Sequence, residues 1–347
     1  MSGQNISGPA AVGKGKRLVD INGNMYNMKP KIIKPKDRAE WLELRKNGIG
    51  ASEVASVVGI SPWTTPFALF LQKSGQLPPI EENNAMHMGR LLEGVVVQLL
   101  EEQTGFKAVK ASAKDIIYQD PEHPWRIVTP DRIAYEVNPG TGKKQKVLVE
   151  AKTSSMSFDP ENLPTYYVAQ CQYQMLVTGV HVCYLCWLTA GRDFGYARIE
   201  YDSEFAEWLA EEVDKFWNEN VLGGKEPDAI AVSDLAVKVP KSTPEKSIEA
   251  DEQALDQLNV LREKKAMYEA LGDEIDDLTN SLKMYMTDSE ALLDGNGNVL
   301  CTWKSGKDKT SFDSKTFAAE NPDLYDKYCK TVPGSRSFLL KKPKNNN

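Results

Sequence analysis

The stretch that most constrains the fold is KVLVEAKTSS, residues 146–155. Residues 147–149 are apolar β-formers in a continuous run, which is typical of a buried strand. The run ends in two opposite charges, Glu150 and Lys152, that lie two residues apart. Because strand side chains alternate between the two faces of a sheet, both charges point to the same side. They form either an ion pair at the end of a strand or half of a site that carries chemistry.

Composition indicates a globular chain with one sizeable core and a smaller second unit, because it has 347 residues, 26% charged and 41% hydrophobic. The sequence has no apolar run of transmembrane length and no apolar region of a secretory signal. The five cysteines are odd in number and suggest no disulfide framework. We therefore expect a cytoplasmic protein without membrane contact. Cys183 and Cys186 form a C-x-x-C pair, a weak zinc or redox signal, but they lie in an apolar strand-like run and are expected to be buried thiols.

Charge is unevenly distributed, although the net charge is −7. From Lys14 to Arg38 there are eight basic residues and only two acidic ones. Such a basic arm either contacts phosphates or is a solvated, flexible tail. We expect four parts: a flexible basic N-terminal arm at 1–36, an α/β domain at 37–225, a linker at 226–249 and a C-terminal helix and hairpin extension at 250–347.

The order of patterns predicts a mixed α/β core with a central sheet flanked by helices. A β-meander is expected over residues 107–120, 125–137 and 146–155. A long helix is expected at 250–287, either as a short coiled coil or packed on its own domain, and a terminal strand at 335–344. Further helices are expected within 37–48, 50–60, 65–75, 83–105, 164–179, 202–224 and 313–330, two strands within 181–201 and a hairpin within 291–306.

A second carboxylate lies one hairpin before the first stretch, in VTPDRIA. Pro130 lacks an N–H and often marks a break in strand pairing, and Asp131 follows it. If the two strands pair antiparallel, Asp131 lies near Glu150 at one end of the sheet. Two carboxylates can hold Mg²⁺, and a lysine beside the metal can orient the attacking water and counter the charge of a phosphodiester transition state. The pattern P-D-x(18)-E-x-K therefore matches the PD-(D/E)xK nuclease core, also called restriction-endonuclease-like.

Neither half of the pattern is specific alone, since E-x-K also occurs at 263–265 and P-D at 227–228 and 322–323. The neighbouring segments make the signal stronger. They resemble, in order, motifs of the YqaJ-type viral recombinase family, which includes the lambda-exonuclease-like nucleases. The resemblance covers residues 37–225 and extends to about residue 340. Its motifs are WLELRKNGIGASEVASVVGISPWTTPFALFLQKSG, MGRLLEGVVVQLLEEQTG, TPDRIA, LVEAKTS and VAQCQYQMLVTG, followed by VLCTWK and ENPDLYDKYCK.

The resemblance implies roles for individual residues. It makes Asp131 and Glu150 metal ligands and Lys152 the catalytic lysine. The pair that holds a 5′-terminal phosphate matches Arg45 and Ser52, and a guanidinium with a hydroxyl near a helix N-terminus suits an anion. On the residues alone they would be a surface arginine and a helix cap. The remaining matches are the helix carboxylate Glu93, the active-site glutamine Gln170 and, less directly, Gln172 on the DNA side.

The resemblance also implies an activity. The protein would be a Mg²⁺-dependent exodeoxyribonuclease, with Mn²⁺ as a substitute, that digests double-stranded DNA from the 5′ end for recombination by single-strand annealing. A ring of three subunits and a single-strand annealing protein are the expected partners. No iron–sulfur cluster is expected, because no cysteine precedes Cys171. The alternatives are a structure-specific or restriction-type endonuclease on the same fold, and a catalytically silent DNA-binding recombination accessory protein.

Overall fold

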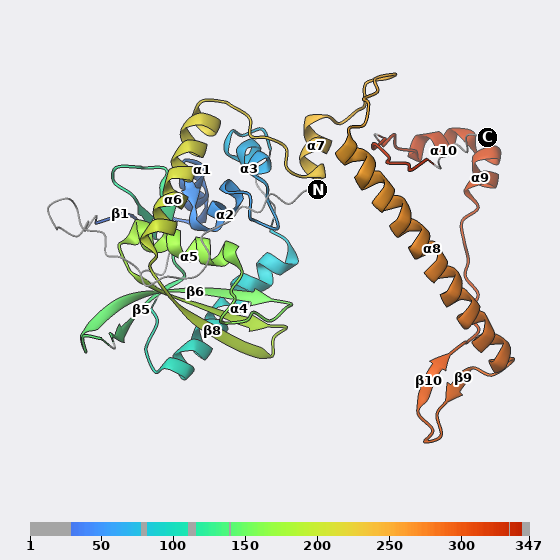
Figure 1. Cartoon of the computed structure of the whole chain (residues 1–347), viewed down its shortest axis with the longest axis horizontal. Helices are drawn as coiled ribbons and strands as arrows, with labels where there is room; N and C mark the ends of the chain where they lie inside the picture. Colours follow the sequence, from blue (N-terminus) through green and yellow to red (C-terminus); the bar gives the residue numbers. More distant parts are fainter. Residues whose placement is uncertain (1–28, 78–81, 110–115, 139, 333, 342–347) are drawn as a thin grey trace. The chain divides into compact units, whose positions relative to one another are not determined.

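The computed structural model describes residues 29–77, 82–109, 116–138, 140–332 and 334–341 (Figure 1). The expected basic arm therefore lies mostly outside the described residues. The chain divides into two compact units, one of which ends at Lys238 while the other begins at Val239. Within the described part, no helix has the length and apolar character needed to cross a membrane.

The first unit contains two four-stranded sheets with helices packed around them. The sheet that carries the charged stretch has the order β5-β6-β7-β8, with β6 and β7 parallel and the outer pairs antiparallel. It consists of β5 (Arg132–Val137), β6 (Lys144–Ser154), β7 (Val182–Thr189) and β8 (Asp193–Glu200). The second sheet, ordered β1-β3-β4-β2, consists of β1 (Lys31–Ile33), β3 (Ile117–Gln119), β4 (Arg126–Val128) and β2 (Ile49–Gly50).

The helices of this unit begin and end at the residues that their sequences favour. Asp37 caps the first of them, accepting a hydrogen bond from the Glu40 amide at 2.9 Å, and Asp202 caps α6 in the same way. Gly105 and Gly179 end α4 and α5 in the left-handed conformation that glycine adopts at least cost. The helices are α1 (Arg38–Lys46), η1 (Ala51–Glu53), α2 (Val54–Val57), α3 (Pro66–Lys73), α4 (Asn84–Thr104), α5 (Thr165–Thr178), α6 (Ser203–Lys215), the π-helical η2 (Phe216–Leu222) and α7 (Val232–Lys238).

The central sheet is buried on both faces, as its continuous apolar strands predict. Figure 1 shows this sheet between α4 and α5. Val147 and Val149 of β6 pack with Val96 of α4 in one cluster. Leu148, on the other face of β6, packs with residues of α5 and α6 in the main core. The predicted mixed α/β core, a sheet flanked by helices, is confirmed.

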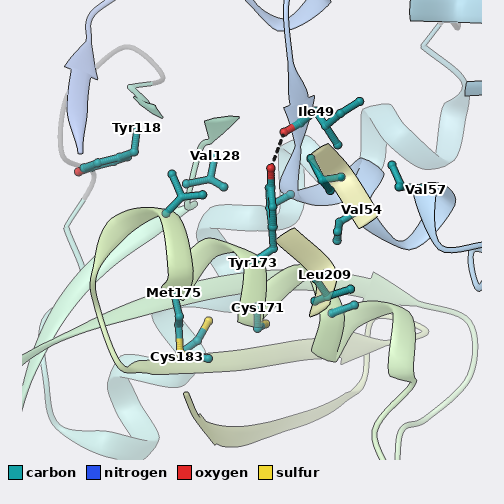
Figure 2. Close-up of a cluster of buried hydrophobic side chains, with 14 of the residues drawn as sticks. Ile49, Val54, Val57, Tyr118, Val128, Cys171, Tyr173, Met175, Cys183 and Leu209 are labelled. Carbon is teal, nitrogen blue, oxygen red and sulfur yellow. Dashed lines mark hydrogen bonds between the residues drawn. The ribbon is translucent and has the colours of Figure 1, made fainter. Parts of the chain in front are cut away.

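The main core surrounds α5. Figure 2 shows Tyr173 of this helix between Val128 of β4 and Leu209 of α6. The Tyr173 ring is fully buried, and its hydroxyl donates to the carbonyl oxygen of Ile49 at 3.5 Å. This contact ties α5 to the segment that links α1 and η1. Gln170 lies on α5, and Arg45 and Ser52 flank the linking segment, so the core holds these site residues in a fixed relation.

The predicted β-meander is only partly correct. Residues 125–137 do not form one strand, because β4 and β5 belong to different sheets. The break falls at Thr129 and Pro130, and proline cannot donate a ladder hydrogen bond. The antiparallel pairing of β5 with β6 is as predicted, with Arg132 opposite Val149. Asp131 directly precedes β5, so continuing this register places it opposite Glu150.

The two cysteines of the C-x-x-C pair point to opposite faces of β7. Cys183 packs in the main core on the α5 side, whereas Cys186 packs in the cluster under α4. Both are buried and free. Their opposite orientations prevent them from chelating one ion together, so their role in the fold is that of small apolar side chains.

The segment expected to be a linker contains α7, whose Asp234 is buried. The carboxylate of Asp234 accepts a hydrogen bond from the Thr65 hydroxyl at 2.6 Å and the amides of Ile230 and Ala231. Its side chain thus holds the end of the first unit against the start of α3. Sequence patterns gave no sign of this contact, because the two partners are 169 residues apart.

The second unit consists of a long helix, a hairpin and two short helices. The long helix, the hairpin at Asp294–Asn298 and the helix break before Pro322 agree with the sequence prediction. The predicted terminal strand is wrong for its described part, since residues 335–341 have no strand partner and form no strand. The elements are α8 (Glu252–Met286), β9 (Ala291–Leu293), β10 (Val299–Thr302), α9 (Ser314–Glu320) and α10 (Pro322–Tyr328).

Candidate active site

The candidate site lies where β6 leaves the core. Leu148, Glu150 and Lys152 alternate onto the face of the sheet that α5 covers, so the charges follow directly on a buried leucine. Glu150 is only 3% exposed. A carboxylate with so little access to water must be paired with hydrogen-bond donors or a cation. Side chains of β6 and α5 supply these hydrogen-bond donors.

The carboxylate of Glu150 accepts three hydrogen bonds from side chains. The Lys152 ammonium donates to Oε1 at 2.6 Å, and the Gln170 amide donates to the same oxygen. The Gln174 amide donates to Oε2 at 2.8 Å. Gln170 also accepts a hydrogen bond from the Lys152 ammonium at 3.0 Å, which closes a ring of three side chains. Glu150, Lys152 and Gln170 therefore have a fixed geometry before any ligand binds.

Asp131 is the second carboxylate of the site. Its Oδ2 accepts a hydrogen bond from the Ala151 amide at 2.9 Å, which places it beside the Glu150 segment of β6. Burial and the nearby charge of Glu150 raise the pKa of Asp131 well above the usual value for a carboxyl group, and Glu93 adds to this effect. The site thus holds more negative charge than its own side chains neutralise.

The pKa of Lys152 is also raised, which for an ammonium favours the charged form. Burial alone would lower the pKa of this ammonium, but the carboxylates of Glu150 and Asp131 outweigh burial and raise it above the usual value for lysine. Lys152 is therefore a cation at neutral pH. In this state it donates hydrogen bonds and stabilises negative charge.

Glu93 extends from α4 on the other side of the sheet and forms an ion pair with Arg132. Arg132 also donates to the backbone oxygen of Asp131 at 2.7 Å. The helix carboxylate is thus linked to the Asp131 segment through one guanidinium. Asp131, Glu150, Lys152 and Gln170 thus lie together, and Glu93, which the resemblance adds to them, is joined to this group through Arg132.

The donor set fits a divalent metal ion with oxygen ligands. The described residues contain no group of three or more His, Cys, Asp or Glu side chains arranged around one ion. Mg²⁺, however, is commonly held by one or two carboxylates, with waters and substrate phosphate oxygens completing its shell. Asp131 and Glu150 are the side chains that would hold it. Burial and the charge of Glu150 raise the pKa of Asp131, and a bound cation would favour its ionised form.

A second polar cluster joins α1 to the start of η1. The Arg45 guanidinium donates to the Ser52 hydroxyl at 3.2 Å and lies 4.8 Å from the centre of the Trp41 ring. A Cβ at Gly50 would lie 2.9 Å from Arg45 Nη2, so a side chain there would displace the guanidinium. The predicted pairing of Arg45 with Ser52 is thus present, with the guanidinium held by an aromatic face.

Two residues that sequence reasoning missed complete this cluster. Glu53 forms ion pairs with Arg45 at 3.3 Å and with Lys73 at 2.9 Å. Lys73 also donates to the backbone oxygen of Arg45 at 2.9 Å. Burial lowers the pKa of Lys73, while the two cations lower the pKa of Glu53 in spite of its burial. The cluster therefore presents two cations and one carboxylate, with net positive charge.

Gln172 lies apart from both clusters. Its amide donates to the backbone oxygen of Glu200 at 2.8 Å, and its side-chain oxygen accepts from the Asp202 amide at 2.9 Å. These bonds hold the start of α6, so we assign Gln172 a structural role in place of the predicted contact with DNA. The glutamine that joins Gln170 at Glu150 is Gln174. The spacing of four residues places these two on one helix face, which is the signal that could have identified it.

Two carboxylates on adjacent antiparallel strands, with a lysine two residues after the second, are the arrangement that the PD-(D/E)xK pattern describes. Residues 40–181 match the family model of the YqaJ-like viral recombinase domain. This part of the chain is therefore similar to the family that its motifs resemble.

Individual relatives cover more of the chain. The uncharacterized protein YqaJ of Bacillus subtilis strain 168 is 29% identical over 304 residues, which are 84% of this chain and 90% of the relative. Among solved structures, the alkaline exonuclease LHK-Exo from Laribacter hongkongensis matches 52% of this chain and 91% of its own, with 20% identity and a TM-score of 0.40. A phage-related exonuclease from Haemophilus somnus 129PT matches 51% and 96%, with 12% identity and a TM-score of 0.37.

Proposed function

We propose that this protein is a divalent-metal-dependent exodeoxyribonuclease that digests linear double-stranded DNA from its 5′ ends. Its products would be nucleotides and 3′ single strands that a single-strand annealing protein uses in phage-type recombination. The observation that carries the proposal is the cluster of Asp131, Glu150 and Lys152, held by Gln170 and Gln174 inside a YqaJ-like domain.

The chemistry follows from the contacts. Asp131 and Glu150 would hold Mg²⁺ or Mn²⁺, which supplies Lewis-acid stabilisation and a more acidic water. Two of the three N–H donors of the Lys152 ammonium hold Glu150 and Gln170, and the third would donate to an oxygen of the scissile phosphate. The ammonium stabilises the charge that develops on the phosphate oxygens. Gln174 holds the second oxygen of Glu150, so the carboxylate keeps its orientation when phosphate approaches.

A test of the proposal compares linear duplex DNA with covalently closed circular DNA of the same sequence. In Mg²⁺ we expect the linear form to be degraded and the closed circle to stay intact, with no degradation of either in EDTA. Cutting of the closed circle would support the restriction-type endonuclease. An absence of degradation of both forms in Mg²⁺ and Mn²⁺ would support the catalytically silent accessory protein.

The cluster of Arg45, Ser52, Glu53 and Lys73 is proposed to hold the 5′-terminal phosphate. Its net positive charge and its fixed guanidinium support this assignment, because arginine binds phosphate through two parallel hydrogen bonds. Ser52 adds a hydroxyl donor in the first turn after Gly50. End recognition of this kind would direct the enzyme to 5′ ends and distinguish it from an endonuclease.

Replacing Arg45 with alanine is expected to remove the preference for a 5′ phosphate. The wild type should digest 5′-phosphorylated duplex about tenfold or more faster than 5′-hydroxyl duplex, since charged hydrogen bonds contribute about 1.5–3 kcal/mol. The Arg45→Ala variant should digest both at the slower rate. Lys46→Ala is the matched control, because Lys46 is the next residue of α1 and pairs with Glu43 on the surface. Equal wild-type rates on both substrates would contradict the assignment.

The family resemblance supports a ring of three subunits as the working form, with processive digestion. Mass measurement of the purified protein in solution tests the subunit number, and a mass of one or two chains would contradict it. Binding of a single-strand annealing protein is expected to persist in the Lys152→Ala variant, because docking does not require catalysis.

A further inference from the structure

An aromatic cluster adjoins the candidate active site at Lys152. The Lys152 ammonium lies 5.0 Å from the centre of the Tyr167 ring, in the geometry of a cation–π contact. Tyr167 also packs against Tyr166 at 4.5 Å and against Phe158 at 5.5 Å between ring centres. Tyr166 and Tyr167 belong to α5, where Tyr167 lies one helical turn before Gln170, whereas Phe158 precedes this helix. The wall of the site beside the lysine is therefore aromatic.

Trp63 extends this wall into solvent. Its ring lies 5.0 Å from Tyr166, edge to face, and 6.0 Å from Tyr167. Its side chain is nevertheless 69% exposed. The loop that carries it is held in place, because the Ser61 hydroxyl oxygen accepts hydrogen bonds from the amides of Trp63 and Thr64. A large apolar ring is thus presented to solvent from a loop of defined shape.

The position of Trp63 suits a nucleobase. The indole is separated from the Lys152 ammonium by one intervening tyrosine, with contacts of 5.0 and 6.0 Å in series. Successive bases of a strand lie about 3.4 Å apart in B-DNA, so this separation corresponds to a few nucleotides. A strand whose phosphate lies at Lys152 therefore brings a base within reach of Trp63. Aromatic side chains stack on any base, as an exonuclease without sequence preference requires.

We propose that Trp63, supported by Tyr166, stacks on a nucleobase of the DNA strand whose scissile phosphate lies at Lys152. The proposal deepens the nuclease function and rests on it. Trp63 would position the strand end for cleavage and would take no part in the bond-breaking step. Its contribution should appear in DNA affinity and in KM, with a smaller effect on kcat.

The test measures binding of a fluorescently labelled duplex end to the full-length protein in EDTA, where no digestion occurs. We expect Trp63→Ala to weaken binding about 5- to 150-fold, which corresponds to the loss of one base stack. Trp63→Phe should retain most of the affinity, because phenylalanine also stacks. Trp208→Ala is the matched control, since Trp208 is 39% exposed on α6 and stacks on Phe205.

A second set of duplexes separates stacking from a structural effect. These duplexes lack the base at one of the first few positions from the 5′ end. At one such position, the wild type should lose affinity while Trp63→Ala loses none further, because ring and base act as a pair. If Trp63→Ala binds as the wild type does, or loses the same factor as the wild type at every abasic position, the stacking proposal is overturned. If wild-type protein degrades linear DNA in Mg²⁺ in the same preparation, the nuclease function stands whichever result is found.

Discussion

Lys152→Ala is expected to slow digestion of linear duplex DNA by about 10²–10⁴-fold, the range for loss of a positioned catalytic side chain. The ammonium is held 2.6 Å from Glu150 and 3.0 Å from Gln170, so no neighbouring cation can take its place without rearrangement. Rates should be measured in saturating Mg²⁺ with a 5′-phosphorylated substrate. Because the affected charge develops in the transition state, kcat should fall more than KM changes.

Lys146→Ala is the control for this prediction. Lys146 lies on the same strand as Lys152, and its side chain points to the same face, but it is exposed near the opposite end of β6. Its removal should leave the rate within about twofold of wild type, as is usual for an isolated surface substitution. Lys152→Ala should also melt at a lower temperature, since Glu150 and Asp131 lose their counter-charge. Assays therefore belong well below that melting temperature. A Lys152→Ala enzyme with wild-type kcat would contradict the assignment.

Asp131→Asn is expected to abolish the rise in melting temperature that Mn²⁺ causes. The same substitution should stabilise the metal-free protein at neutral pH. The raised pKa of Asp131 means that its ionised form is unfavourable in the fold, because of burial and the charge of Glu150. Its contribution to stability is fully present below the unfolded pKa, near 3.9, and is lost as pH rises through the raised folded pKa. Asparagine keeps an oxygen that can accept from the Ala151 amide, and it carries no charge.

Thermal melts in EDTA test the stability half of this prediction. Near pH 7.5, Asp131→Asn should melt above wild type, by about 2–4 °C for each kcal/mol gained. The difference should shrink as the pH approaches 4. Addition of Mn²⁺ should raise the melting temperature of the wild type but not of the variant, and digestion by the variant should fall about 10²-fold or more. A variant that melts below wild type in EDTA, or that still responds to Mn²⁺, would contradict the proposed metal site.

Much of the fold could be predicted because its determinants are local. Asp37 and Asp202 cap helices, and Gly105 and Gly179 end them, as the sequence indicates. The alternation of side chains along a strand is equally local, and it predicts that the two charges of β6 share one face. The split of the meander at Pro130 was the main error, because the sequence marked a break but did not say that a second sheet begins on its far side.

At the site, the sequence misassigned Gln172 and did not identify Gln174, Glu53 and Lys73, for a different reason. Which face of α5 meets the sheet depends on the packing of Tyr173 in the core, and that contact joins residues far apart in the chain. The packing turns Gln174 toward Glu150 and Gln172 toward α6. Glu53 and Lys73 were missed for the same reason, since their ion pair forms only when α3 lies against η1. Sequence patterns identified the charged centre, whereas tertiary packing selects the residues that support it.

The proposed activity is tested most directly by following both strands of a linear, 5′-phosphorylated duplex in Mg²⁺ on a denaturing gel, with wild type and Lys152→Ala. With a label at the 3′ end, the wild type should give a ladder of steadily shorter strands, and with a label at the 5′ end the label should be released first as a mononucleotide. Lys152→Ala should leave both strands at full length over the same period. Shortening from the 3′ ends, internal cuts, or digestion that is unchanged in Lys152→Ala would contradict the proposal.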